Sequence, residues 1–388
     1  MHRFDVIVLG LGAMGSAALY QLAKRSADVL GIDRFEPPHP YGSSGGETRI
    51  TRIACGEGAD YSHFAPRSHA IWREIEAELG VELLTQNGLL VISGPGQRAA
   101  GHDNPEFLKT TIAAARLAQV PHRIMTGADV RTEFPVFDVR NDDVAYHDAV
   151  GGFVRPEQCI AAQLALARRN RAAIHVNETV LGFEPQAGSV RVTTDKAVYA
   201  ATRLVVTAGP WLPALLGGGS SLPFTVTRQV LYWFRPRDEK ALAAFKPERC
   251  PVYIWQIPAP QIVYGFPALG GVEDGVKLAT EQYAEATTPD AVDRTVEPDE
   301  IAAMYRTYVA PYFPGLTSIC VKTHVCLYTW VAQARFVIDR HPACDDVIVA
   351  SPCSGHGFKH SAAIGELLAQ MALGEPHHDI SRFGFAAS

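Results

Sequence analysis

The stretch FDVIVLGLGAMG, residues 4–15, decides the fold. Its apolar run from Phe4 to Leu9 predicts a buried strand, and the glycines that follow predict a tight turn. A helical pattern then continues to about Lys24. A strand, a glycine turn and a helix N-terminus together form an anion site, because free backbone N–H groups and the helix dipole point at the ligand.

The spacing of the glycines matches a dinucleotide-binding fingerprint. Gly10 permits the tight turn, Gly12 lets the backbone approach a pyrophosphate, and Gly15 lets the helix pack close to the sheet. The next predicted strand, residues 29–32, ends at Asp33, at the spacing expected for an acid that binds a ribose hydroxyl. An acid here favours NAD or FAD over NADP, which carries a 2′-phosphate. The alternative is a glycine turn in a doubly wound sheet that binds nothing.

A second glycine turn lies more than three hundred residues later. A short predicted strand, residues 347–350, leads into SGHGFK, residues 354–359, and then into a predicted helix, residues 361–373. A third buried strand, residues 204–207, leads into AGPW, residues 208–211. A simple NAD enzyme needs neither addition, whereas FAD spans both ends of such a sheet and can use all three turns. The pattern therefore favours FAD.

Composition narrows the classes of function. The chain has 388 residues, enough for two domains, and its 47% hydrophobic and 20% charged residues are typical of a soluble globular protein. A net charge of −6 gives no general attraction for nucleic acid or an anionic membrane. No apolar run approaches the roughly 20 residues of a membrane span. The seven cysteines lack metal-ligand spacing and indicate reduced thiols in a cytoplasm. We expect neither a metal site nor a nucleophilic triad.

The middle of the chain changes character. Residues 190–194 and 197–200 predict a β-hairpin. The stretch GGGSS, residues 217–221, predicts a flexible connector. The β-rich, aromatic segments beyond it include a predicted hairpin whose strands are residues 252–257 and 262–266.

We therefore expect an α/β fold, with a Rossmann-type FAD-binding domain and an inserted α+β substrate domain built on a largely antiparallel sheet. The FAD-binding domain is expected to be discontinuous and to take residues 1–85, 150–218 and 320–388. The substrate domain is expected to take residues 86–149 and 219–319.

A family resemblance rests on several motifs along the chain. They are Gly10 to Gly15, GSSGGETRITR at 42–52, GGFVRPE at 151–157, YGFP at 264–267, CLYT at 326–329 and SGHGFK at 354–359. With them the chain resembles, nearly end to end, the monomeric sarcosine oxidase family. This is a branch of the glutathione-reductase-like, D-amino-acid-oxidase-like flavoproteins that also contains N-methyltryptophan oxidase, pipecolate oxidase and the fructosyl-amine oxidases. The resemblance implies a monomer with covalently bound FAD that oxidises a secondary amine beside a carboxylate, with O2 as acceptor and hydrogen peroxide as product.

The resemblance also implies roles for single residues. Cys326 stands where the family's flavin-linked cysteine stands, so a thioether to FAD is expected. The plainer interpretation is a buried structural cysteine, and Cys320 is close by in sequence. Arg52 and Lys359 are expected to bind the substrate carboxylate, with Arg49 nearer the flavin ring. A lysine at a helix N-terminus is unfavourable unless an anion joins it, which supports this role.

Further residues complete the expected site. Lys277 is expected to lie over the flavin and promote its reaction with oxygen, because a fixed positive charge stabilises negative charge that develops on oxygen. The plainer interpretation is that Lys277 is an edge or snorkelling residue on a half-buried strand. Tyr328 is expected to line the pocket. The complete set expected to bind the cofactor is Gly10, Gly12, Ala13, Met14, Gly15, Asp33, Arg34, Ser43, Thr48, Arg49, Val180, Ala208, Gly209, Trp211, Cys326, Gly355, His356, Gly357, Phe358 and Lys359.

Two departures from the family pattern concern the substrate. The family's loop before Thr48 usually carries histidine, whereas this chain has Ser44 and Gly45. Four residues after Lys277 the family often has a histidine in the substrate pocket, whereas this chain has Glu281. We therefore expect Glu281 to contact the substrate. The expected substrate is bulkier than sarcosine, such as one that bears a cation or extra hydroxyls.

The expected reaction transfers a hydride equivalent from the carbon beside nitrogen to the flavin, after which water hydrolyses the imine. Three alternatives stay open. They are a flavin dehydrogenase that passes electrons to a protein or quinone, an oxidase that deaminates a primary amino acid, and a dinucleotide-binding sensor without catalysis. Production of peroxide separates an oxidase from a dehydrogenase, and a colourless protein that binds NAD reversibly would favour the sensor.

Overall fold

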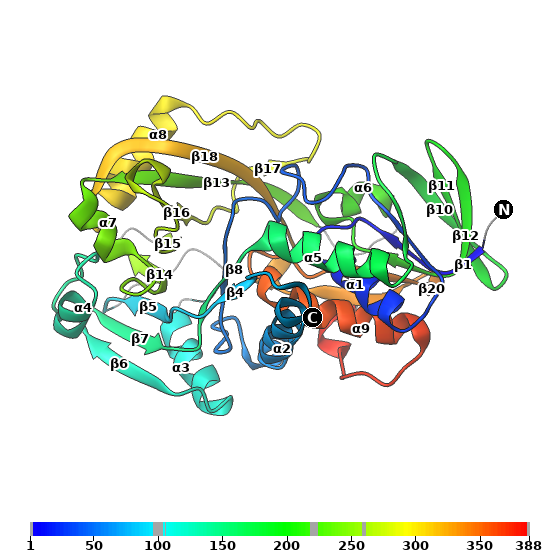
Figure 1. Ribbon diagram of the computed structural model, residues 1–388, viewed down its shortest axis with the longest axis horizontal. Helices are drawn as coiled ribbons and strands as arrows, with labels where there is room; N and C mark the ends of the chain where they lie inside the picture. Colours follow the sequence, from blue (N-terminus) through cyan, green and yellow to red (C-terminus); the bar gives the residue numbers. More distant parts are fainter. Residues whose placement is uncertain (1–2, 96–103, 105, 218–223, 258–260, 386–388) are drawn as a thin grey trace.

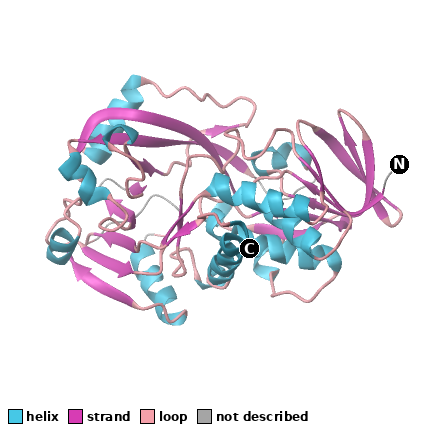
Figure 2. Ribbon diagram, in the orientation of Figure 1, coloured by secondary structure: helices cyan, strands magenta, loops and turns pink. Residues whose placement is uncertain are grey.

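The computed structural model describes residues 3–95, 104, 106–217, 224–257 and 261–385. These residues form an eight-stranded, a nine-stranded and a three-stranded sheet. Figure 1 shows the two large sheets at opposite ends of an elongated molecule, with several helices between them. Figure 2 shows the same division by secondary structure.

The eight-stranded sheet contains the predicted Rossmann core. Its central strands run parallel in the order β9, β2, β1, β12, β20. Their bounds are β9 (Ala173–His175), β2 (Val29–Ile32), β1 (Arg3–Leu9), β12 (Val198–Val206) and β20 (Cys344–Ser351). The antiparallel strands β10 (Val180–Gln186), β11 (Ser189–Thr194) and β19 (Val337–His341) extend this sheet.

Helices bury one face of this parallel sheet. They are α1 (Ala13–Lys24), α2 (Phe64–Leu79), α5 (Pro156–Arg169) and α9 (Ser361–Leu373), and a short α6 (Leu212–Leu215) follows β12. α1 packs against both α5 and α9, and the apolar side chains of these helices join those of the sheet in one core. The close approach of α1 and α9 needs Gly365, because a Cβ there would lie 2.3 Å from the Cβ of Ala17. The strand at 29–32 and the helix at 361–373 have the bounds that the sequence predicted.

The prediction for residues 197–207 was wrong in one respect. The second hairpin strand and the buried strand after it are a single strand, β12. Its first residues pair antiparallel with β11 and its last residues pair parallel with β20, while β1 runs alongside. The half-buried polar residues Thr202 and Arg203 interrupt the apolar pattern without ending the strand, because backbone pairing continues through them.

The nine-stranded sheet confirms the prediction of a second, largely antiparallel sheet. Among its described pairings only β5 with β14 is parallel. Its strands are β5 (Leu89–Ser93), β6 (His122–Thr126), β7 (Val144–Asp148), β13 (Thr225–Pro236), β14 (Val252–Ile257), β15 (Gln261–Gly265), β16 (Val276–Thr280), β17 (Ala286–Thr287) and β18 (Leu316–Trp330). The predicted hairpin is β14 with β15, although its turn, residues 258–260, lies outside the described residues. The helices α3 (Phe107–Leu117), α4 (Gly127–Glu133), α7 (Glu239–Phe245) and α8 (Pro298–Met304) accompany this sheet.

The small sheet joins the two halves of the molecule. It consists of β3 (Arg49–Thr51), β8 (Gly152–Val154) and β4 (Leu84–Thr85). β3 pairs with β8, and this brings the motif at 42–52 beside the motif at 151–157. The domain boundaries stay a prediction: β18 remains paired with β13 as far as Trp330, and most of the connector at 217–221 lies outside the described residues. In the part of the chain that the structure covers, no helix combines the length and the apolar character needed to cross a membrane.

Candidate functional site

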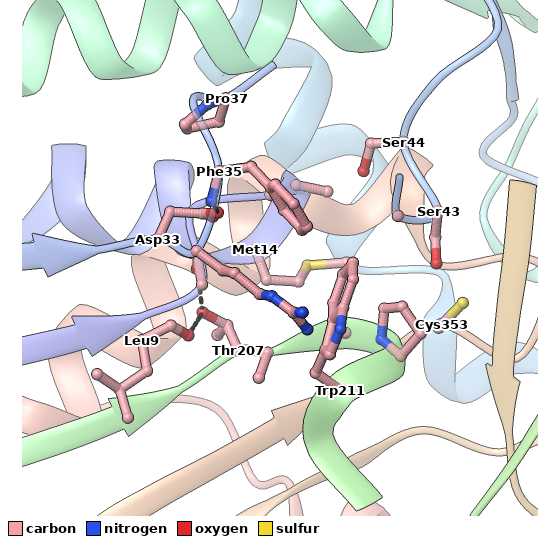
Figure 3. Close-up of a pocket in the computed structure, with 18 of the residues that line it drawn as sticks. Leu9, Met14, Asp33, Phe35, Pro37, Ser43, Ser44, Thr207, Trp211 and Cys353 are labelled. Carbon is pink, nitrogen blue, oxygen red and sulfur yellow. Dashed lines mark hydrogen bonds between the residues drawn. The ribbon is translucent and has the colours of Figure 1, made fainter. Parts of the chain in front are cut away.

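A cavity of about 440 Å³ opens at the carboxyl ends of β1, β2, β12 and β20 (Figure 3). In open parallel sheets this edge is where ligands bind. Most residues predicted to bind the cofactor line the cavity. They are Gly10, Gly12, Ala13, Met14, Asp33, Arg34, Ser43, Arg49, Val180, Ala208, Gly209, Trp211, Gly355, Gly357 and Phe358. Gly15, Thr48, Cys326, His356 and Lys359 do not line it.

The first glycine turn is fixed by steric constraints. Gly10 has a φ of +82°, and a Cβ there would lie 2.7 Å from the Thr207 carbonyl oxygen. A Cβ on Gly15 would lie 1.8 Å from the Gly10 carbonyl oxygen, so this glycine lets α1 pack against the turn. A Cβ on Gly12 would meet only the Ser44 hydroxyl, at 4.0 Å, which leaves room for a ligand to approach the backbone.

Asp33 holds the turn from the end of β2. Its carboxylate accepts hydrogen bonds from the backbone N–H of Leu11 at 2.6 Å and of Phe35 at 2.8 Å. Figure 3 shows Asp33 and the rings of Phe35 and Trp211 around the same cavity. The Trp211 indole N–H also donates to Asp290 at 3.3 Å, and Arg34 pairs with that carboxylate at 2.8 Å.

A smaller cavity of about 70 Å³ adjoins the first. Both are lined by Arg49, Tyr328, Gly355 and Phe358, so a molecule in the small cavity would lie beside a ligand in the large one. The small cavity collects the residues predicted to bind the substrate, Arg52, Lys359 and Glu281, and also His356. Its apolar walls come from Ile50, Phe107, Ile254, Ile262 and Phe266.

Glu57 is the residue that sequence analysis missed here. Its carboxylate lies 2.6 Å from Arg52 Nη2, 3.5 Å from Lys359 Nζ and 3.6 Å from His356 Nδ1. Burial lowers the pKa of Arg52, but the charge and hydrogen bond of Glu57, together with weaker contributions that include Glu281, outweigh burial, so that this pKa is raised. Burial lowers the pKa of Lys359, and Glu57 opposes that shift. The two predicted carboxylate-binding cations are therefore already bound to a carboxylate of the chain itself.

Lys277 lies on β16, is buried, and lines neither of these cavities. Its ammonium donates hydrogen bonds to the Gly46 carbonyl at 2.6 Å, to the Thr48 carbonyl at 2.7 Å and to the Thr48 hydroxyl at 3.1 Å. It faces a third cavity, of about 700 Å³. Burial, followed by the positive charge of Arg49, holds the pKa of Lys277 well below its ordinary value.

Arg49 also binds carbonyl oxygens of the same loop. Its guanidinium donates to the carbonyl oxygens of Thr48 at 2.8 Å, Ser43 at 2.9 Å and Gly45 at 2.6 Å. Gly45, one of the two loop positions that depart from the family pattern, lies against His324 of β18. A Cβ on Gly45 would lie 2.6 Å from Nε2 of His324. Burial and then Arg49 lower the pKa of His324 to about 4, which keeps this imidazole neutral.

Three cysteines lie near this region in different settings. Cys326 is buried on β18, and burial raises its pKa while Arg49 and Lys277 oppose the shift. Cys320 is half-buried on the same strand and lines none of the three cavities. Cys353, to which sequence analysis gave no role, lines the large cavity, as Figure 3 shows, and accepts a hydrogen bond from the Thr329 N–H at 3.4 Å.

Comparison with known proteins agrees with this geometry. The family described as DAO, FAD dependent oxidoreductase, matches residues 5–371. The chain is 38% identical over 382 residues to the monomeric sarcosine oxidase of Streptomyces avermitilis, covering 98% of this chain and 96% of that protein. It is 31% identical over 385 residues to the N-methyl-L-tryptophan oxidase of Yersinia pestis, covering 99% of each. The solved structure of NikD, an amino acid oxidase of nikkomycin biosynthesis, superposes with a TM-score of 0.84 at 22% identity, over 99% of this chain and 98% of that one, which shows the fold.

Proposed function

Because the chain belongs to the FAD-dependent oxidoreductase family, in the branch of the monomeric sarcosine oxidases and N-methyltryptophan oxidases, we propose that it oxidises a secondary amino acid. The carbon beside nitrogen loses a hydride equivalent, O2 becomes hydrogen peroxide, and water hydrolyses the imine. The observation that carries this proposal is the position of the buried pair Arg52 and Lys359. They line a small cavity that shares walls with the dinucleotide cavity.

The large cavity fits FAD. The turn at Gly10 to Gly15 and the N-terminus of α1 would hold the pyrophosphate, and Asp33 would face the ribose. Gly12 supports this fit, because a side chain there would meet no protein atom closer than 4.0 Å. Bound FAD supplies the two-electron redox chemistry, which no side chain of the chain provides.

The small cavity is built to bind a carboxylate. Arg52 offers a planar, always-charged group, and Lys359 adds a second cation. Glu57 stands where a substrate carboxylate would bind, so substrate and Glu57 compete for the same two cations. The single negative charge of Glu57 compensates part of the positive charge of Arg52 and Lys359 before the substrate arrives, which limits the cost of burying them.

Glu281 is a further charged residue in the wall of the small cavity. It is buried and lines the wall with Tyr264 and Tyr328, and the Tyr283 hydroxyl lies 3.4 Å from its carboxylate. A carboxylate here favours a substrate that brings a cation or hydroxyl groups beyond its reacting amine. About 70 Å³ is small for such a group, so the substrate enters fully only when the Glu57 side chain moves away from Arg52.

The reaction with oxygen is assigned to Lys277. Its amino group is held by fixed carbonyl groups, so the positive charge of the protonated form is positioned before negative charge develops on oxygen. Covalent attachment is assigned to Cys326, on the family resemblance. Cys353, which lines the large cavity, is the alternative site of flavin attachment to be tested beside Cys326.

The test begins with the anaerobic protein. Sarcosine, N-methyl-L-tryptophan and L-proline are each compared with glycine and L-tryptophan, and bleaching of the flavin absorbance is followed. We expect secondary amines to bleach it faster and later admission of O2 to yield one peroxide per flavin. Equal rates with primary amines would indicate a deaminating oxidase, and reoxidation without peroxide would indicate a dehydrogenase.

A further inference from the structure

The loop at 42–48 is held by charged side chains on both its N–H groups and its carbonyl groups. Gly46 has a φ of +101° and Glu47 a φ of +70°, and the left-handed region is uncommon for a non-glycine residue such as Glu47. Consecutive residues of this kind turn their backbone N–H groups toward one point, where an anion can bind. In this structure the anion is Glu157.

Glu157 holds the N–H side of the loop. One of its carboxylate oxygens accepts hydrogen bonds from the N–H of Gly46 at 2.7 Å and from the N–H of Glu47 at 3.1 Å. Glu157 stands in the first turn of α5, where the helix dipole favours a negative charge. It belongs to the motif at 151–157, whose strand β8 pairs with β3.

Two cations hold the carbonyl side of the same loop. Lys277 donates to the carbonyl oxygens of Gly46 and Thr48, and Arg49 donates to those of Ser43, Gly45 and Thr48. The backbone at Gly46 therefore lies between an anion on its N–H and a cation on its carbonyl. Glu157 and Lys277 also line the same cavity of about 700 Å³.

We propose that Glu157 is a positioning residue that acts through Lys277. It fixes the two carbonyl groups that hold the Lys277 ammonium, and its negative charge helps to keep that ammonium protonated. The inference rests on the proposed function, in which Lys277 promotes the reaction with oxygen.

The charges around Lys277 determine whether removal of the Glu157 charge raises or lowers the pKa of Lys277. Burial and then Arg49 lower the pKa of Lys277, whereas the negative charges of Glu157 and Glu47 raise it. His324 also faces this group and is neutral, because its own pKa is lowered to about 4. Removing the charge of Glu157 therefore lowers the pKa of Lys277 further, and Lys277 loses its proton at a lower pH.

The variant Glu157→Gln separates charge from shape, since the amide oxygen can still accept from the Gly46 N–H. Reduced holoenzyme is prepared with dithionite, and its reoxidation by O2 is followed across pH, so no substrate is needed. We expect the fall in reoxidation rate at high pH to move down by about one pH unit. Glu273→Gln is the matched control, because Glu273 lines the same cavity but is exposed and paired with Arg235.

A second measurement uses hydrogen exchange of the same holoenzyme. Glu157→Ala removes the acceptor itself, and hydrogen exchange of the peptide that covers 42–48 should speed up at Gly46 and Glu47, while Glu157→Gln stays protected. Unchanged exchange in Glu157→Ala would overturn the inference. So would an unchanged pH profile in Glu157→Gln when Lys277→Met slows reoxidation. A Lys277→Met variant that reoxidises normally would instead overturn the oxygen role in the proposed function.

Discussion

Because Glu57 contacts both Arg52 and Lys359, we predict that its removal changes the affinity of the site for carboxylate ligands. In Glu57→Gln the competing charge is gone, so an added carboxylate ligand meets Arg52 and Lys359 without displacing an ion pair. The native contacts are 2.6 and 3.5 Å long, and both Arg52 and Glu57 are only 4% exposed, so solvent screens the pair little. A hydrogen bond between charged groups contributes about 1.5–3 kcal/mol. If the competing interaction of Glu57 contributes about 2 kcal/mol, its removal should tighten carboxylate binding about thirtyfold.

The assay is titration of the flavin spectrum with a carboxylate that cannot be oxidised, such as benzoate or acetate. Unfolding is followed in parallel, because Glu57→Gln also leaves two buried cations without their anion. We expect the variant to melt lower without ligand and to gain more stability from the ligand than the native protein does. Glu366→Gln, which breaks an ion pair with Arg67 at 2.7 Å, is the control for lost stability without changed affinity. Equal or weaker carboxylate binding in Glu57→Gln would refute the competition and make Glu57 a support for Arg52.

Four further changes test other parts of the structure. Arg52→Ala should weaken carboxylate binding by about 3 kcal/mol, roughly a hundredfold, in the same titration; unchanged affinity would remove Arg52 as the anchor. Lys277→Met should slow reoxidation by about 10²–10³ and leave flavin reduction nearly unchanged, and equal changes in both half-reactions would contradict its role. Burial, followed by Arg73, lowers the pKa of His69 to about 4, below its unfolded value, so stability falls as pH drops from about 6.5 to 4. His69→Gln should remove about 2 kcal/mol of the loss between pH 7 and pH 5 in urea unfolding, and an unchanged loss would exclude this histidine as its source. Cys326→Ala should release the flavin on acid precipitation, and release by Cys353→Ala in its place would reassign the linkage.

The features that sequence analysis predicted well are local. The turn at Gly10 to Gly15 and the helix at 361–373 depend on apolar spacing and glycine geometry, which neighbours along the chain determine. The expected break before residue 204 was wrong, because the polar residues Thr202 and Arg203 interrupt the apolar pattern while the pairing of β12 with β1 continues past them.

The charged site depends instead on packing between distant segments. Lys277 meets the carbonyls of Gly46 and Thr48 across 231 and 229 positions of sequence, and nothing near either segment indicates that contact. Glu57 lies five positions from Arg52, yet its contact with Lys359 appears only when the turn at 358–360, just before α9, packs against β3. Local patterns thus predict elements and the cofactor turn, because backbone sterics act between neighbours. The pairing of buried charges follows from which segments the fold brings within hydrogen-bond distance, and that is a property of the whole chain.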